Sequence, residues 1–237
     1  MANDQDEVNC YRDVRRLAKS GHGLEIAAQR LDSLDKCVLH YVTDLRKTRA
    51  DHPALVLELG CGSGGLTKTI AGLGAEVLAI DKEDYEDEVL KNDVGSALTQ
   101  QASIRFFRAS LPTFPSEAGK CVFDCVVSQR ALHYLRYEET KAVLVWCRQH
   151  MRADGRLFLG VSGLGSELGF GYAHSSIRVQ DRWARLSRLM ANKHGIEHEV
   201  CLYTEGELCA LAEESGLRVE DCWKSNFGNI KLIGSPT

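Results

Sequence analysis

Residues 54–65 restrict the possible fold more than any other segment, because an apolar run passes directly into a glycine-rich loop. The run reads Ala-Leu-Val-Leu-Glu-Leu, the loop reads Gly-Cys-Gly-Ser-Gly-Gly, and Leu66 then begins an amphipathic pattern. Glycines let a backbone approach a ligand where a side chain would collide. The first turn of a helix also has unpaired N–H groups that can face an incoming ligand. The segment therefore predicts a buried strand, a ligand-binding turn and a helix.

A second apolar run, over 76–81, reads Glu-Val-Leu-Ala-Ile-Asp and ends in a carboxylate. In a parallel sheet this acid would lie at the carboxyl edge of the strand beside the glycine loop, where it can accept both hydroxyls of a ribose. Together, the two strands, the glycine turn, the helix and the acid predict a site for a cofactor that contains a nucleoside.

Two kinds of cofactor fit this pattern. Gly60, Gly62 and Gly65 satisfy the G-x-G-x-x-G spacing of dinucleotide sites, which leaves a nicotinamide-dependent reductase open. Glu58, two residues before the first glycine, would repel a pyrophosphate but suits the ammonium and sulfonium groups of S-adenosylmethionine. The longer pattern Glu58-x-Gly60-x-Gly62-x-Gly64 resembles motif I of the class I S-adenosylmethionine-dependent methyltransferases.

Composition excludes several other classes of protein. With 237 residues, a formal net charge of −4 and a pI near 6.1, the chain has room for one α/β domain with additions and has no global positive field for nucleic acid. No apolar run approaches the roughly 20 residues of a membrane span, and the acidic, polar N-terminus is unlike a secretory segment. We therefore expect a cytoplasmic protein. The nine scattered cysteines predict reduced thiols and no metal site.

Strands alternate with helices along the middle of the chain, which predicts a parallel sheet with both faces covered. The patterns predict strands over 54–59, 76–81, 104–108, 122–127 and 156–161, and helices over 10–19, 23–48, 64–73, 86–100 and 137–152. A further helix over 204–214 precedes two strands, 218–225 and 229–235, that form a hairpin. The expected α/β fold is a seven-stranded, mostly parallel, doubly wound sheet with a terminal antiparallel hairpin, which resembles the class I methyltransferase sheet.

These patterns divide the chain into four parts. They are an N-terminal helical lid over 1–53, the cofactor-binding core over 54–162, a helical insertion over 163–203, and the C-terminal helix and hairpin over 204–237. We expect the insertion to form the acceptor side, with a helix over 177–193. Tyr172, Arg178 and Arg182 are its predicted acceptor-binding residues, because arginines at helical spacing can hold an anion. The alternative is a solvated helix face with its arginines paired to surface acids.

The resemblance to class I methyltransferases implies which residues hold the cofactor. The glycine loop would hold its methionine portion, Asp81 its ribose, and the residues after the second and third strands its adenine. Ser128 and Gln129 would line the methyl-donor pocket at the end of the fourth strand. The expected cofactor-binding residues are Glu58, Gly60, Cys61, Gly62, Gly64, Asp81, Lys82, Ala109, Ser110, Leu111, Ser128 and Gln129.

His133 and Tyr134 follow the same strand and are the predicted catalytic residues, since an imidazole can remove a proton as a nucleophile accepts the methyl group. Arg130 is a further predicted acceptor-binding residue. Motifs of base, cytosine C5, ribose 2′-O and protein-arginine methyltransferases are absent from the sequence. The expected function is methyl transfer from S-adenosylmethionine to O, N or S of a small metabolite, either anionic or neutral, with S-adenosylhomocysteine as product. A protein or RNA acceptor, and a cofactor-binding sensor without transferase activity, are the alternatives.

Overall fold

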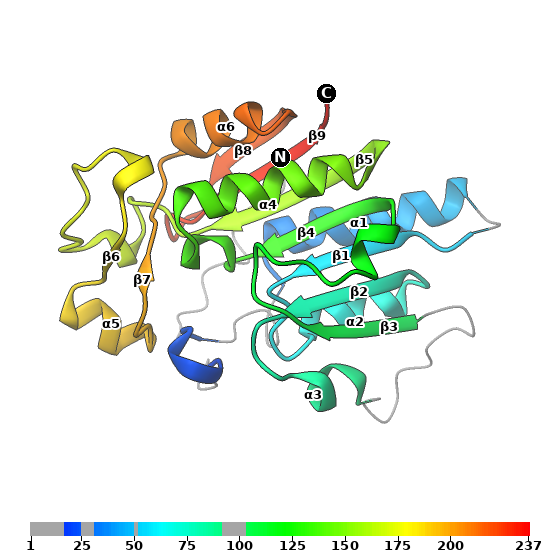
Figure 1. The fold of residues 1–237 in the computed structure, drawn as a ribbon, viewed down its shortest axis with the longest axis horizontal. Coiled ribbons are helices and arrows are strands. Elements are labelled where there is room, and N and C mark those ends of the chain that lie inside the picture. Colours follow the sequence, from blue (N-terminus) through cyan, green and yellow to red (C-terminus); the bar gives the residue numbers. More distant parts are fainter. Residues whose placement is uncertain (1–16, 25–30, 50–51, 92–102) are drawn as a thin grey trace.

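The computed structural model describes residues 17–24, 31–49, 52–91 and 103–237, which build an α/β fold around a seven-stranded sheet (Figure 1). The strand order is β3-β2-β1-β4-β5-β9-β8. The strands β1 to β5 pair in parallel, whereas β9 is antiparallel to both β5 and β8. The predicted mostly parallel sheet with a terminal antiparallel hairpin is confirmed. The strands are β1 (Leu55–Leu59), β2 (Glu76–Asp81), β3 (Ser103–Arg108), β4 (Phe123–Gln129), β5 (Met151–Val161), β8 (Leu217–Lys224) and β9 (Ile230–Pro236).

Helices cover both faces of the sheet, because successive side chains of a buried strand point to opposite sides. In β1, Val56 packs with the helices of one face and Leu57 with those of the other. Helices α1 and α2 cover the first face, and α4 and α6 cover the second (Figure 1). The helices are α1 (Ser33–Thr48), α2 (Gly65–Gly72), α3 (Glu86–Leu90), α4 (Tyr137–Gln149), α5 (Arg188–His194) and α6 (Glu205–Glu214). No helix in the described ranges combines the length and the apolar character that crossing a bilayer requires.

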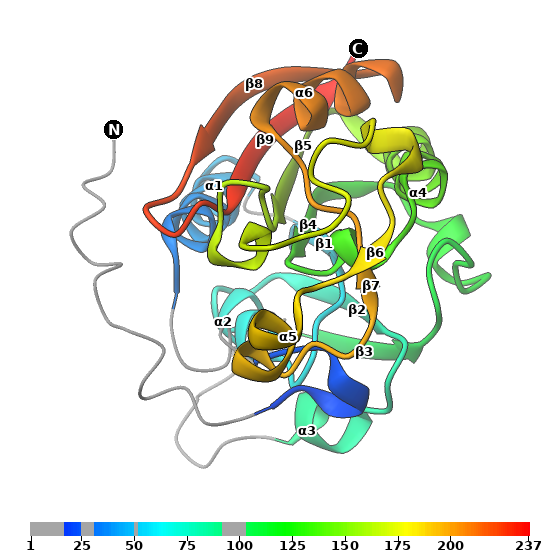
Figure 2. The ribbon, with the colours of Figure 1, turned by 90° about the vertical axis from the view of Figure 1, so that its left-hand side faces the viewer.

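The carboxyl ends of the parallel strands meet at one edge of the sheet, which faces the viewer in Figure 2. Over this edge lie residues 17–24, which we call the strap, and the segment 163–203. The short strands β6 (Ala184–Arg185) and β7 (Glu199–Val200) pair antiparallel within that segment and form a second, two-stranded sheet. This edge is therefore covered by chain from both ends of the sequence.

The helix predicted over 177–193 is wrong. The segment contains a 3₁₀ turn at 179–181, the strand β6 and all of α5 except its last residue. Tertiary bonds override the helical spacing here: the Arg182 guanidinium donates to the carbonyls of Ile177 and Leu202 and pairs with Glu207. Of the apolar residues at helical spacing here, Val179, Leu186 and Met190 are buried and Trp183 is half-buried.

The N-terminal helix prediction is partly wrong as well. Its second helix begins at Ser33, since the Asp32 side chain accepts hydrogen bonds from the backbone N–H groups of Leu34 and Asp35 and so caps the helix. Residues 17–24 contain a 3₁₀ turn and an antiparallel bridge between Leu17 and Leu24 in place of a regular helix. The remaining predicted helical residues, 10–16, 25–30 and 92–100, lie outside the described residues.

Candidate functional site

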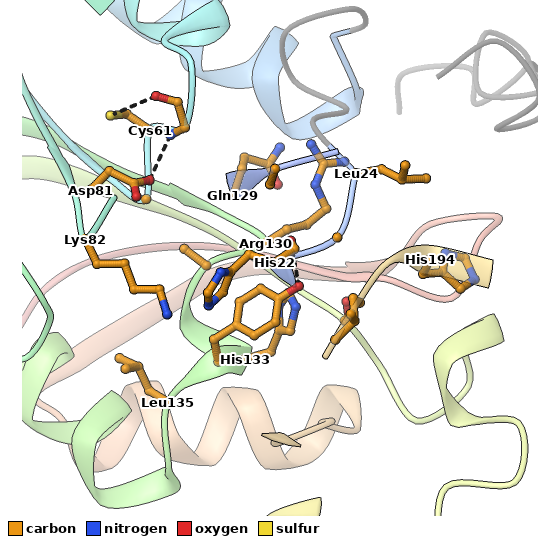
Figure 3. Close-up of a pocket in the computed structure, with 18 of the residues that line it drawn as sticks. His22, Leu24, Cys61, Asp81, Lys82, Gln129, Arg130, His133, Leu135 and His194 are labelled. Atoms are coloured by element: carbon orange, nitrogen blue, oxygen red, sulfur yellow. Dashed lines mark hydrogen bonds between the residues drawn. The ribbon is translucent and has the colours of Figure 1, made fainter. Parts of the chain in front are cut away.

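A cavity of about 960 Å³ opens at the carboxyl edge of the sheet. Its wall comes from the glycine loop after β1, the end of β2, the turn after β3, the end of β4, the strap and the segment 163–203 (Figure 3). Most of the predicted site residues lie on this wall, although they are far apart in the sequence. Those on the wall are Gly60, Cys61, Gly62, Asp81, Lys82, Ala109, Ser110, Leu111, Gln129, Arg130, His133 and Tyr134.

The glycine loop needs its glycines for two different reasons. Gly60, Gly62 and Gly64 have φ angles of 73°, 52° and 80°, which side chains rarely adopt. A Cβ on Gly60 would also lie 2.2 Å from the Cβ of Ala131, so the loop packs closely on the segment that follows β4. At Gly62 an added Cβ would meet nothing within 4 Å, which leaves the space over the loop open.

Asp81 closes the other side of the loop. Its carboxylate accepts hydrogen bonds from the backbone N–H groups of Gly62 and Glu83, each at 2.9 Å. Each oxygen therefore accepts one bond and keeps a second acceptor site. Burial raises the pKa of this carboxyl above its usual value. The side chain thus joins the ends of β1 and β2 and can still accept hydrogen bonds from a ligand.

Three predicted cofactor residues lie outside the cavity wall: Glu58, Gly64 and Ser128. Glu58 is buried beneath the loop, where it accepts a hydrogen bond of 2.6 Å from the Thr67 hydroxyl on α2. Burial raises the pKa of Glu58 to about 8. Ser128 donates to the carbonyl of Leu59 at 3.1 Å and so links β4 to β1. Glu58 and Ser128 therefore bond to the elements that carry the loop.

Sequence reasoning missed a buried polar network behind the cavity. The Gln129 amide nitrogen donates to Asp32 at 2.8 Å and to Asp35 at 2.7 Å, and its oxygen accepts a bond of 3.0 Å from Lys231. Lys231, which is 1% exposed, also pairs with Asp32. Asp32 and Asp35 form a capping box at the start of α1, and this spacing was the available signal. Because Lys231 lies on β9, the network joins three distant parts of the chain.

Gly160 makes room for this network. A Cβ at Gly160 would lie 2.1 Å from the side-chain oxygen of Gln129. The missing side chain lets Gln129 reach past β5 toward Lys231. Burial alone would raise the pKa of Asp32, but the charges of Lys231 and Arg130 lower it to about 2. Burial and the charge of Asp32 raise the pKa of Asp35 above its usual value.

His133 and Tyr134 lie side by side in a 3₁₀ turn after β4, with ring centroids 4.3 Å apart. His133 is 2% exposed, and its Nδ1 has no hydrogen-bond partner among the described residues. Burial, assisted by the charge of Arg130, lowers the pKa of His133 to about 3, so the imidazole is neutral at physiological pH. Burial raises the pKa of Tyr134, whose hydroxyl donates to the carbonyl of His22 at 2.8 Å.

The strap is held to the segment 163–203 by backbone bonds. Gly23 donates to the carbonyl of Gly195, and Glu197 donates to that of Gly21, each at 3.0 Å. At the opposite side of the cavity, the backbone N–H of Lys19 donates to the Tyr85 hydroxyl at 2.7 Å. The strap therefore spans the cavity from the end of β2 to α5.

Three predicted acceptor-binding residues do not line the cavity: Tyr172, Arg178 and Arg182. Arg182 is 4% exposed and makes a bidentate pair with Glu207 at 2.7 and 2.9 Å, so it anchors the segment 163–203 to α6. Arg178 is exposed and pairs with Asp181 three residues later. The Tyr172 hydroxyl donates to the carbonyl of Val200 inside a small apolar cluster. The prediction of an arginine clamp for the acceptor is therefore wrong, because the helix that would have aligned the arginines does not form.

Known proteins share both the motif and the fold. Residues 56–155, which include the glycine loop, Asp81 and the end of β4, match the model of a family described as "Methyltransferase domain". Residues 56–155 therefore have the sequence pattern of a methyltransferase domain. Among the described residues, no group of three or more His, Cys, Asp or Glu side chains could hold a metal ion.

Curated relatives of this chain include two ubiquinone biosynthesis O-methyltransferases. The protein from Xanthomonas axonopodis pv. citri is 27% identical over 169 residues, which cover 71% of this chain and 64% of the relative. The mitochondrial protein from Mus musculus is 27% identical over 137 residues, which cover 51% of this chain and 36% of the relative. The matched region therefore spans less than two thirds of either relative.

Solved methyltransferases share the fold at lower identity. The 1,6-didemethyltoxoflavin-N1-methyltransferase of Burkholderia thailandensis, solved with 1,6-didemethyltoxoflavin and S-adenosylhomocysteine, is 18% identical with a TM-score of 0.59. That match covers 90% of this chain and 79% of the solved one. The magnesium protoporphyrin IX methyltransferase of Synechocystis PCC 6803 is 17% identical with a TM-score of 0.56, and covers 86% and 84%.

Proposed function

We propose that this protein transfers a methyl group from S-adenosylmethionine to an oxygen, nitrogen or sulfur atom of a small molecule and releases S-adenosylhomocysteine. The observation that carries the proposal is the cavity of about 960 Å³ where the glycine loop, Asp81 and the end of β4 meet. Small-molecule and cofactor sites measure about 300–1,000 Å³, so this cavity is large enough for a cofactor with an acceptor beside it. The names of the curated relatives support a small-molecule acceptor.

In this proposal the two sides of the cavity have different tasks. Asp81, with one acceptor site left on each oxygen, binds the ribose hydroxyls. The open backbone over Gly62 accommodates the methionine portion. Lys82 and the turn over 109–111 flank the adenine. The acceptor occupies the remaining space between the end of β4, the strap and the segment 163–203.

The bound cofactor supplies a methyl group already activated by its sulfonium, so the protein mainly has to hold the acceptor in line with it. Orientation of this kind lowers a barrier by up to about 7–11 kcal/mol. The strap and the segment 163–203 line the site and are joined by backbone hydrogen bonds. His133 is neutral and has no partner at Nδ1 among the described residues, so its imidazole can accept a hydrogen bond from the acceptor and, as a weak base, its proton. Tyr134 keeps its proton and positions the strap.

Calorimetric titration with S-adenosylhomocysteine tests this proposal directly. We expect saturable binding by the wild type, and Asp81→Ala should weaken it by at least about tenfold, because a charged hydrogen-bond acceptor contributes roughly 1.5–3 kcal/mol. Asp84→Ala is the matched control, since that nearby acid is exposed and lies off the cavity wall. Absence of binding, or equal affinity in Asp81→Ala, would refute the assignment. Labelled donor with a metabolite mixture would then identify the acceptor.

A further inference from the structure

Arg130 has a backbone conformation that costs energy. Its φ angle is 56°, in the left-handed region that favours glycine, and Ser20 is the only other non-glycine residue with positive φ in the described part of the chain. The conformation is held by a hydrogen bond of 2.7 Å from the Arg130 N–H to the carbonyl of Gly160. Strained residues persist where the surrounding structure enforces them, often at ligand sites.

The Arg130 guanidinium also has no partner in the described part of the chain. It is half-buried on the cavity wall and makes no hydrogen bond or ion pair with any described residue. Other cations on the same wall are satisfied or solvated. Lys19 pairs with Glu88, Lys193 pairs with Glu167, and Lys82 is exposed. A guanidinium has five N–H donors, and partial burial without acceptors is unfavourable.

Two buried acids that are influenced by the charge of Arg130, Asp32 and Asp35, have other hydrogen-bond partners. Arg130 lies close enough to Asp32 and Asp35 to lower the pKa of both carboxyls, against burial that raises them. Their oxygens already accept bonds from Gln129, from backbone N–H groups and, in Asp32, from Lys231. Figure 3 shows Arg130 and Gln129 on the same side of the cavity, with Leu24 nearby. The network therefore has its hydrogen bonds without Arg130, whose charge no described residue pairs.

We propose that Arg130 binds the carboxylate of a ligand in this cavity. A planar guanidinium forms two parallel hydrogen bonds with a carboxylate, which a lysine cannot reproduce. The inference rests on the proposed function, because the ligand is either the methyl donor, through its methionine carboxylate, or an acceptor that has a carboxylate of its own. The chemistry is shared by the two sources, and the experiment separates them.

The first arm compares two probes that differ only at the amino-acid end. S-adenosylhomocysteine has the carboxylate, whereas 5′-deoxy-5′-methylthioadenosine has the same adenosine and a thioether without amino or carboxylate groups. If the cofactor supplies the carboxylate, Arg130→Met weakens S-adenosylhomocysteine by about 10- to 100-fold and leaves methylthioadenosine unchanged. Arg130→Lys should recover only part of the loss. Arg178→Met, an exposed arginine off the cavity wall, is the matched control.

The second arm titrates benzoate, with benzamide as its uncharged counterpart, into protein with and without saturating S-adenosylhomocysteine. If the acceptor supplies the carboxylate, the wild type binds benzoate more tightly than benzamide, and Arg130→Met loses this preference while its S-adenosylhomocysteine affinity stays normal. Unchanged S-adenosylhomocysteine affinity together with no benzoate preference, or a preference that survives in Arg130→Met, overturns the proposal.

Arg130→Gly separates binding from folding. Because glycine adopts positive φ without strain, this variant should melt at or above the wild-type temperature and still show the binding loss. Equal binding by a well-folded Arg130→Gly would also overturn the proposal. If the wild type binds neither adenosine probe, the proposed function fails, and the benzoate titration on unliganded protein still decides the assignment of Arg130.

Discussion

At the scale of single residues, Glu58 makes stability depend on pH. Its pKa of about 8 lies above the ordinary value of 4.5, so between these values the folded chain retains a proton that the unfolded chain has lost. Stability therefore falls as pH rises through this window, by up to about 1.4 kcal/mol per pH unit. Glu58→Gln, which resembles the protonated acid, should be more stable than the wild type at pH 8, and the difference should shrink toward pH 5.

Urea unfolding at pH 5, 6.5 and 8 measures this effect. Glu138→Gln, at an exposed acid on α4, is the control and should leave the pH dependence unchanged. Equal slopes of stability against pH in wild type and Glu58→Gln would mean that Glu58 is ionised beneath the loop.

His133 gives a second prediction about pH. Burial lowers its pKa to about 3, so the imidazole stays neutral down to about pH 4. If His133 takes the acceptor's proton, His133→Gln should lower kcat by at least about 10²-fold and leave the affinity for S-adenosylhomocysteine unchanged. The pH profile of the wild-type kcat/KM should have no inflection near pH 6.5 that is caused by His133 and is therefore lost in His133→Gln. Such an inflection would show instead that the imidazole is charged at that pH.

Residues of the cavity wall could be predicted from the sequence where they belong to a local motif at the end of a parallel strand. Gly60, Gly62 and Asp81 follow from strand ends in sequence, and parallel pairing of β1 with β2 brings them together. Lys231 was not predictable. It reads as an ordinary position of the last strand, and only the placement of β9 beside β5 brings it to Gln129.

At the scale of elements, the Lys231 network joins β9, β4 and the start of α1. Removing one partner of a buried ion pair leaves an uncompensated charge, which costs about 3–5 kcal/mol. Lys231→Met should therefore lower the free energy of unfolding by about that amount, because Asp32 loses its cation. Asp32→Asn added to Lys231→Met should recover part of the loss. The measurement is a double-mutant cycle by denaturant unfolding, and strictly additive effects would contradict the coupling.

The element scale also explains which helices were predictable. Helices α2, α4 and α6 pack on the sheet along their apolar faces, so their hydrophobic spacing matches their structure. The apolar spacing over 177–193 indicated residues that are buried, but the helix that it predicted does not form. There the segment covers an edge of the sheet, and the buried Arg182 bonds to the carbonyl of Leu202 and to Glu207 on α6. Such long-range bonds leave no periodic trace in the sequence.

At the scale of the whole molecule, the cavity is roofed by two segments that meet only after folding. The strap comes before α1, and residues 194–198 come late in the chain, yet they share backbone hydrogen bonds and a bridge between His22 and Ile196. The rings of His22 and His198 stack with centroids 4.2 Å apart. Because each segment supplies partners for the other, we expect the two to open and close as one unit.

Amide hydrogen exchange tests this coupling. Tyr134→Phe removes the hydroxyl that donates to the His22 carbonyl, a bond worth about 0.5–1.5 kcal/mol. Exchange of the Gly23 and Glu197 amides, which bridge the two segments, should then accelerate together by roughly 2- to 13-fold, while amides of β1 and β4 keep their rates. Tyr137→Phe, which removes a hydroxyl bonded to Glu214 on α6, is the matched control. Acceleration of Gly23 alone would mean that the strap moves independently of residues 194–198, and the roof would then consist of two separate lids.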